Sequence, residues 1–277
     1  MNDKVTAVRD VWRYEQGEMS RQTDRMVTEY PLTVMVNGSE FVTLVCTPEH
    51  IKELVIGFLA SEGVIRFQKE IKRFTIDESL GFVYVDLIHP ETLDQQEYTK
   101  RVIGSCCGKG RHFYFQQDVK TAKTAVSQMK ISPESCLALM KDMQKGSGTF
   151  QETGGVHNAA LCDTEKVLLM RTDIGRHNAL DKLYGHCLLN GMSVRNKLIV
   201  FSGRISSEVL LKAAKIGVSI VISKSAPTEL AIQMAEELNI TAIGFVRNGS
   251  FNVYTHPERI GDRRGCSNEY RISPDVR

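Results

Sequence analysis

The chain has 277 residues, of which 42% are hydrophobic and 25% are charged, the balance of an ordinary globular protein. This composition excludes disorder, collagen and coiled coil as descriptions of the whole chain. A formal net charge of +2 gives no strong positive field for nucleic acid, so we expect no nucleic-acid partner.

The N-terminal sequence MNDKVTAVRDVWRYEQ lacks the apolar core of a signal peptide. No run of the chain approaches the roughly 20 apolar residues of a membrane span. We therefore expect a cytoplasmic protein without a membrane partner, in a compartment where thiols stay reduced. The seven cysteines are odd in number and scattered, which argues against a disulfide framework.

The first regular elements are predicted after residue 30. Residues 32–46 alternate apolar and polar side chains around Asn37-Gly38, which predicts a β-hairpin. Residues 47–49, Thr-Pro-Glu, supply a capping residue, a proline and an early acid, so we expect a helix to begin there. Gly63 would end that helix.

Two further strands are expected at 71–76 and 82–88. Residues 1–100 are therefore predicted to form a smaller α+β region of hairpins with one helix. A second helix is expected from Ser132-Pro133-Glu134 to about Lys145. The segment 146–155 has four glycines in ten residues, which favours a mobile connection.

The pattern then changes to alternating strands and helices. Strands are expected at 166–171, 197–202, 218–223 and 240–246, and helices at 173–191, 206–217 and 226–239. This alternation indicates an α/β domain over residues 101–277, with a largely parallel open sheet covered by helices on both faces.

Three of these strands are followed by small polar and basic residues. The three segments are RTDIGRH at 171–177, SGRISS at 202–207 and SKSAPT at 223–228. Ligands of open α/β sheets bind beyond the carboxyl ends of the strands, and helix N-termini favour anions. We therefore predict an anion site at this edge. The alternative is ordinary capping and turn chemistry, which selects the same residue types.

A second chemical signal is the segment SCCGKG at 105–110. Adjacent cysteines are poor partners for a structural disulfide, and one pair supplies too few ligands for zinc. Glycines make the loop flexible, and Lys109 and Arg111 favour the nucleophilic thiolate. The alternative is a pair of small residues beside a basic turn. The cysteines in apolar segments, which we expect in the core, are Cys46, Cys136, Cys162 and Cys187.

Two histidines are candidates for ligand contact. The sequence around His157 resembles the zinc deaminase signature, but Ala159 stands where that signature needs Glu, and no Pro-Cys-x-x-Cys follows. Deaminase chemistry is therefore excluded. His157 is either a packing residue or a ligand contact. His177, between Arg176 and Asn178 at a predicted helix start, is the better candidate.

Longer strings identify a family. SCCGKG, TGGVHNAAL, DIGRHNALDK, SGRISSE, SKSAPT and VYTHPERI occur in this order from residue 105 to Ile260. Together they resemble the formate dehydrogenase accessory sulfurtransferase family (FdhD). The resemblance implies a cytidine deaminase-like fold for the larger domain. It also implies that persulfide sulfur is accepted from a cysteine desulfurase and passed to the molybdenum cofactor, bis-molybdopterin guanine dinucleotide, for formate dehydrogenase.

The resemblance also implies site residues and partners. Many family members carry Ser-Cys-Gly-x-Cys-Gly; aligning this chain on Cys-Gly makes Cys107 the catalytic persulfide cysteine, whereas Gly110 replaces the second cysteine. A homodimer is implied, with the cofactor as bound substrate and no permanently bound metal. The segment matching the guanine-dinucleotide site is Phe245, Val246, Arg247, Asn248, Gly249 and Ser250.

In that segment, Arg247 is expected to meet phosphate or to stack on guanine, and Gly249 to allow close approach of the backbone. A plain hairpin turn is the alternative interpretation. Two other functions remain open from the sequence: a non-catalytic chaperone of the molybdenum cofactor, which would leave the cysteines idle, and a thiol–disulfide oxidoreductase.

Overall fold

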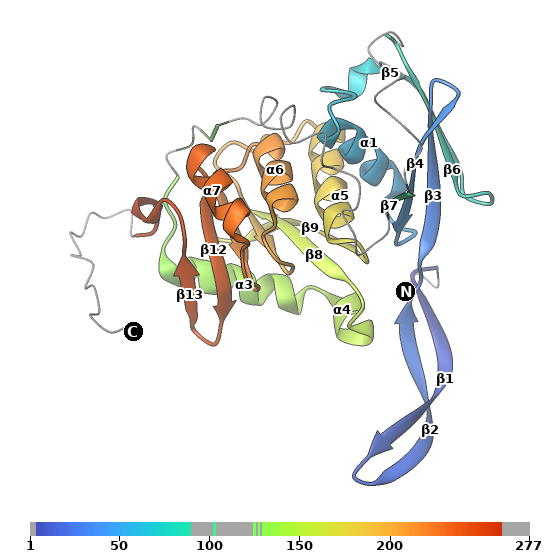
Figure 1. Cartoon of the computed structure of the whole chain (residues 1–277), viewed down its shortest axis with the longest axis horizontal. Coiled ribbons are helices and arrows are strands. Elements are labelled where there is room, and N and C mark those ends of the chain that lie inside the picture. The colour runs from blue at the N-terminus through green and yellow to red at the C-terminus, as the bar shows by residue number, and fades with distance from the viewer. Residues whose placement is uncertain (1–3, 90–101, 104–123, 126, 128, 262–277) are drawn as a thin grey trace.

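The structure is a computed structural model that describes residues 4–89, 102–103, 124–125, 127 and 129–261. It contains a six-stranded sheet, a five-stranded sheet and a two-stranded ribbon (Figure 1). Cys106 and Cys107 lie outside the described residues.

The six-stranded sheet has the strand order β13-β12-β11-β10-β8-β9. Its strands are β8 (His157–Cys162), β9 (Val167–Asp173), β10 (Leu198–Phe201), β11 (Ile220–Ser223), β12 (Thr241–Arg247) and β13 (Ser250–Val253). β10, β11 and β12 pair in parallel, whereas β8 is antiparallel to both β10 and β9. β9 therefore runs in the same direction as β10.

Helices cover both faces of this sheet, as the sequence predicts. α5 (Arg176–Leu189), α6 (Ser207–Ile216) and α7 (Glu229–Glu237) lie on one face and α3 (Pro133–Lys145) on the other (Figure 1). Alternate strand residues divide between the two cores: Ile199 and Phe201 pack with α5–α7, whereas Leu198 and Val200 pack with α3. The predicted burial on both faces is confirmed, but the sheet is mixed rather than largely parallel, because β8 and β13 pair with their neighbours in antiparallel.

The N-terminal sheet has the order β5-β6-β3-β4-β7. Its strands are β3 (Tyr30–Val36), β4 (Ser39–Cys46), β5 (Ile71–Asp77), β6 (Phe82–Leu87) and β7 (Val102–Ile103), with α1 (Ile51–Ser61) packed against it. The hairpin at Asn37-Gly38 is confirmed, with φ of 50° and 82°. β7 pairs with β4, so the N-terminal sheet includes backbone beyond residue 101. The division at 100/101 stays a prediction.

Two expected local structures are wrong. α1 begins at Ile51 after an N-cap at His50, not at residues 47–49. The Thr47 hydroxyl instead donates a hydrogen bond of 3.0 Å to Asp173 Oδ2, so it does not cap the helix. Residues 146–155 contain a short helix, α4 (Gly148–Thr153), where the sequence suggests a mobile connection. Gly154, with φ of 64°, ends that helix.

A long ribbon that no sequence pattern predicted precedes the N-terminal sheet. β1 (Thr6–Glu15) and β2 (Glu18–Val27) pair over their whole length, and the ribbon projects away from both larger sheets (Figure 1). The turn is Gln16-Gly17, with positive φ at both residues. Trp12 is 68% exposed on this ribbon.

The two larger sheets are joined through a close crossing of α1 and α5. A Cβ added at Gly57 would clash with the carbonyl group of Asp181, and one added at Gly185 would clash with the carbonyl group of Glu53. Because neither residue has a side chain, the two helix backbones come into direct contact.

Candidate functional site

The carboxyl ends of four strands lie at one edge of the six-stranded sheet. β9, β10, β11 and β12 end there, and the antiparallel β8 begins there at His157. The expected meeting of the segments after β9, β10 and β11 at a common edge is therefore confirmed. We call this the carboxyl edge.

The turn after β12 forms one end of the carboxyl edge. The pairing of β12 with β13 is irregular between Gly244 and Arg247, and Phe245 has a φ of 55°. The guanidinium carbon of Arg247 lies 5.5 Å from the centre of the Phe245 ring. The Phe245 amide donates a hydrogen bond of 3.1 Å to the Ser225 carbonyl oxygen, which ties this turn to the loop after β11.

In the same turn, Val246 is buried, whereas Arg247, Asn248, Gly249 and Ser250 are exposed. Asn248 and Gly249 both have positive φ. The Ser250 hydroxyl donates a hydrogen bond of 3.2 Å to the Arg247 carbonyl oxygen. The segment is therefore a hairpin turn, which was the alternative interpretation of the sequence. This turn exposes the Arg247 side chain and the backbone around Gly249 to solvent.

Serine side chains at the ends of β10 and β11 hold the neighbouring loops together. The Ser202 hydroxyl accepts a hydrogen bond of 2.9 Å from the Asn158 amide, and the Ser223 hydroxyl donates one of 2.6 Å to the Gly203 carbonyl oxygen. These contacts agree with the turn-chemistry interpretation. The basic neighbours Arg204 and Lys224 are exposed.

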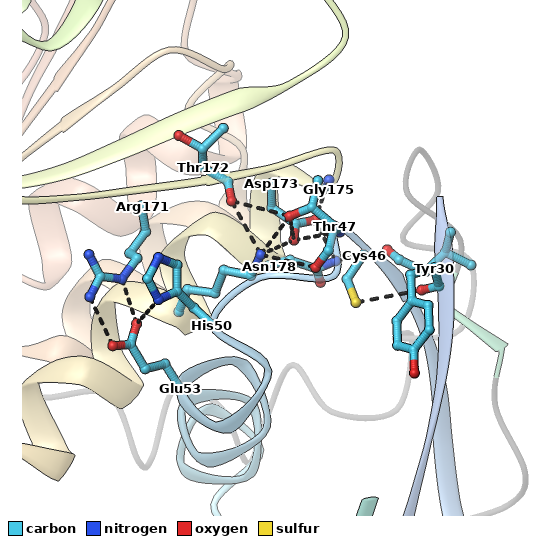
Figure 2. A network of polar contacts seen from close by, with 12 residues as sticks. Tyr30, Cys46, Thr47, His50, Glu53, Arg171, Thr172, Asp173, Gly175 and Asn178 are labelled. Carbon is cyan, nitrogen blue, oxygen red and sulfur yellow. Dashed lines mark hydrogen bonds and ion pairs between the residues drawn. The ribbon is translucent and has the colours of Figure 1, made fainter. Parts of the chain in front are cut away.

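Two charged residues at the end of β9, Arg171 and Asp173, behave differently, because their side chains contact residues in and just before α1 (Figure 2). Asp173 is fully buried; its carboxylate lies 2.6 Å from Lys182 Nζ and accepts a hydrogen bond from the Thr47 amide. Arg171 binds Glu53, with 2.8 Å between Nη2 and Oε1. Neither side chain is available to an anionic ligand.

This group is part of a polar seam between α1, β9, α5 and α6. We define the polar seam as Thr47, Glu53, Ser61, Arg171, Asp173, Asn178, Asp181, Lys182, His186, Lys212 and Lys215. Lys182, Lys212 and Lys215 are all buried. No local sequence pattern indicated this seam, because many of its contacts join residues more than 100 positions apart, such as Thr47 with Asp173 and Ser61 with Asp181.

His157 and α5 meet at the carboxyl edge. Burial lowers the pKa of His157, and the charges of Arg176 and His177 lower it further. His177 Nε2 lies 3.0 Å from Glu208 Oε2, and burial lowers the pKa of His177 also. Arg176 Nε is buried and, among the described residues, has no hydrogen-bond partner. The edge thus combines neutral imidazole with guanidinium groups.

The four cysteines predicted to lie in the core are confirmed there. Burial raises the pKa of the Cys46, Cys136 and Cys162 thiols to about 12 and that of Cys187 to about 11. The described part of the chain holds no group of three or more potential metal ligands. Its helices are all too short or too polar to cross a membrane.

Comparisons with known proteins give the family. The model of the FdhD/NarQ family matches residues 27–261. The sulfur carrier protein FdhD of Bacillus subtilis is 94% identical over 260 residues, which cover 94% of this chain and 99% of that protein. The sulfur carrier protein FdhD of Staphylococcus haemolyticus is 56% identical over 261 residues, covering 94% and 98%.

A solved structure shows the same fold. The crystal structure of a proposed formate dehydrogenase accessory protein from Desulfotalea psychrophila has a TM-score of 0.75 at 21% identity, over 92% of this chain and 99% of that chain. With the match of the family model over most of the sequence, the chain belongs to the FdhD/NarQ family.

Proposed function

We propose that this protein is a sulfur carrier of formate dehydrogenase maturation. It accepts persulfide sulfur from a cysteine desulfurase on Cys107 and passes it to the molybdenum cofactor, bis-molybdopterin guanine dinucleotide, which it binds as substrate. Relatives that are 94% and 56% identical carry the name sulfur carrier, which supports this role.

The distribution of the cysteines carries the proposal. A persulfide carrier needs an accessible thiolate, and four of the seven cysteines are buried with pKa values far above neutral. The remaining candidates are Cys106, Cys107 and Cys266. Cys107 lies beside Gly108 and Lys109 in the string that resembles the family's sulfur-carrying segment.

The accepting step is an exchange between sulfur atoms. The Cys107 thiolate attacks the outer sulfur of the desulfurase persulfide; a sulfur–sulfur bond forms on Cys107 as the donor's bond breaks, and the donor thiolate leaves. The sulfane sulfur changes partner without net oxidation, so this step needs no external oxidant. Lys109 and Arg111 would favour the attacking thiolate.

The cofactor is a large anion, and the carboxyl edge supports its binding. Three exposed basic side chains, those of Arg204, Lys224 and Arg247, lie at the ends of the three neighbouring strands β10, β11 and β12. The buried Arg176 Nε, which lacks a hydrogen-bond partner among the described residues, is a donor that a bound ligand could satisfy. Guanidinium groups suit phosphate because they donate two parallel hydrogen bonds.

Replacement of Cys107 tests the carrier role. We expect Cys107→Ala to abolish formate dehydrogenase activity in cells that depend on this protein, while the purified variant still binds guanosine diphosphate. Cys187→Ala, at a buried cysteine, is the control and should keep the activity. If the protein were only a chaperone of the cofactor, the Cys107→Ala variant would still support formate dehydrogenase activity, which would contradict the carrier role. A thiol–disulfide oxidoreductase would reduce a disulfide substrate but accept no sulfur from a desulfurase.

Guanosine diphosphate also tests the position of the substrate. Calorimetry should show that Arg247→Ala weakens its binding by about 1–3 kcal/mol, the range of a charge-assisted contact, and that salt weakens binding to the unmodified protein. Arg195→Ala, at an exposed arginine before β10, should bind normally. Equal affinities of Arg247→Ala and the unmodified protein would place the site elsewhere. Adenosine diphosphate should bind more weakly than guanosine diphosphate if the protein forms hydrogen bonds to the guanine base.

We further propose that the protein is a homodimer. A two-stranded ribbon on its own is marginally stable, and the β1–β2 ribbon exposes Trp12, Tyr14 and Met19 on one face. Sedimentation should give a dimer mass, and Trp12→Ser with Tyr14→Ser should shift the protein toward monomer. A monomer mass for the unmodified protein at high concentration would contradict this proposal.

A further inference from the structure

A cavity of about 420 Å³ opens at the carboxyl edge where β8 begins. It lies among the end of β2, α3, α4 and the first residues of β8. Its lining includes Val27, Glu29, Met143, His157, Ile174 and Lys224. The volume is within the range of pockets that bind small molecules.

The walls combine apolar surface with a few polar groups, which is typical of sites for small molecules and cofactors. Val27, Met143 and Ile174 supply apolar wall. A Cβ at Gly155 would lie 2.8 Å from Val27 Cγ1, so the glycine lets the base of the ribbon close one side of the cavity.

Three polar side chains of the lining suit different parts of a heterocyclic ring. Glu29 is exposed, so its carboxylate stands where the cavity meets solvent and can accept two neighbouring N–H donors. His157 is partly buried and its pKa is lowered; a neutral imidazole offers one donor and one acceptor. The Lys224 amine is exposed and is the cavity's contact for a negative substituent.

The cavity and the Arg247 turn are two ends of one edge. β10 and β11 separate β8 from β12, so the two ends are roughly 14 Å apart at the usual strand spacing. The exposed side chains of Arg204 and Lys224 follow the intervening strands. This order suits a ligand with a heterocycle at each end and a pyrophosphate between them. One heterocycle would lie in the cavity, the pyrophosphate beside the basic side chains, and the other heterocycle at the Arg247 turn.

We propose that the cavity binds the pterin end of the molybdopterin guanine dinucleotide, with the Glu29 carboxylate accepting the N–H donors of its aminopyrimidine ring. This inference rests on the proposed function and adds the second ring site to it. The guanine end then lies at the Arg247 turn, and the pyrophosphate lies beside Lys224 and Arg204. The cavity therefore selects a pterin, and the turn selects a nucleotide.

Two soluble probes test this arrangement on the full-length protein. Pterin-6-carboxylate stands in for the pterin end, and its binding is followed by its own fluorescence. Guanosine diphosphate stands in for the other end and is followed by calorimetry. The variants are Glu29→Gln, which is nearly isosteric at an exposed position, and Arg247→Ala. Glu165→Gln, at an exposed carboxylate in the turn between β8 and β9, is the matched control.

We expect both probes to bind together, with no displacement of pterin-6-carboxylate by saturating guanosine diphosphate. Glu29→Gln should weaken pterin binding on the order of tenfold or more, as for loss of hydrogen bonds to a charged group, and leave guanosine diphosphate binding unchanged. Arg247→Ala should do the reverse. Glu165→Gln should change neither affinity.

Three results would overturn the inference. These are mutual displacement of the two probes, equal pterin affinity of Glu29→Gln and the unmodified protein, and absence of pterin binding. Loss of guanosine diphosphate binding in Glu29→Gln would place guanine in the cavity. Persulfide formation on Cys107 is measured separately, and Glu29→Gln leaves that cysteine intact. The pterin site can therefore be disproved without disproving the sulfur-carrier function. Equally, failure of persulfide formation on Cys107 would leave the result on pterin binding unchanged.

Discussion

The polar seam and the carboxyl edge both place charged residues at strand ends of the six-stranded sheet, but these residues have opposite roles. In the seam, Asp173 and Lys182 are fully buried and bonded to each other. At the edge, Arg204, Lys224 and Arg247 are exposed. A buried charge with a partner is committed to the fold, whereas an exposed basic group beside strand ends is available to a ligand.

The difference also explains why Arg171 does not belong to the edge. Burial alone would raise the pKa of Glu53, but hydrogen bonds from Arg171 and His186 outweigh that effect and hold the pKa below its ordinary value. The Arg171 guanidinium thus stabilises a carboxylate of α1. Seam variants should therefore change stability, and edge variants should change binding.

The largest expected effect is at Lys182. Replacing it by Met leaves the buried Asp173 carboxylate without its cation, which should lower the free energy of unfolding by about 3–5 kcal/mol. Urea denaturation measures this change. The double variant Lys182→Met, Asp173→Asn removes both charges and should recover part of the loss. Equal stability of Lys182→Met and the unmodified protein would contradict the structural role of the seam.

A smaller loss is expected from Gly185→Ala in the crossing of α1 and α5. The added methyl group would meet the Glu53 backbone, so the helices must separate, at a cost of about 1–3 kcal/mol or somewhat more. Gly148→Ala, where a Cβ meets nothing within 4 Å, is the control. Thermal unfolding compares the two, and an equal midpoint for both would show that the crossing is loose.

Glu53, with its partners Arg171 and His186, should make the free energy of unfolding depend on pH in the acidic range. Because the pKa of Glu53 is lowered in the folded protein, its contribution is fully present above its unfolded value, about 4.5. It is lost as the pH falls through the lower folded value. Unfolding measured from neutral to acidic pH should therefore show a smaller loss in Glu53→Gln than in the unmodified protein. If the free energy of unfolding fell equally with pH in both proteins, Glu53 would not be a source of the acid dependence.

The smallest effect on stability is expected at the edge. Arg247 is exposed and its guanidinium lies over the Phe245 ring, so Arg247→Ala should change the free energy of unfolding by about 1 kcal/mol or less. Denaturation midpoints measure this directly. A loss as large as that of Lys182→Met would erase the distinction between seam and edge.

Local patterns predicted most of the regular structure. The Asn37-Gly38 hairpin, the α3 start at Ser132 and the alternating strands and helices after residue 166 all depend on neighbouring residues. The β1–β2 ribbon was missed because its turn is Gln16-Gly17, and its two faces are both mostly exposed. A strand without a buried face has little alternation to detect.

The carboxyl edge was predictable because parallel strands bring their ends together whatever their distance in sequence. The burial of Asp173 away from this edge was not predictable, since its carboxylate binds Thr47, which is 126 residues earlier in the chain. The cavity was not predicted for the same reason, because Glu29, His157 and Lys224 are distant in the sequence and line one cavity only in the folded chain. By contrast, the burial of four cysteines was predictable from the apolar segments around them, and this burial raises the pKa values of their thiols.

Mass spectrometry after incubation with a cysteine desulfurase and cysteine tests the carrier role most directly. We predict a gain of about 32 Da, one sulfur atom, on the peptide that contains Cys107, removed by reductant. The peptides of Cys46, Cys136, Cys162 and Cys187 should stay unmodified because these thiols are buried. Sulfur found on Cys106 alone, or retained unchanged by Cys107→Ala, would contradict the account.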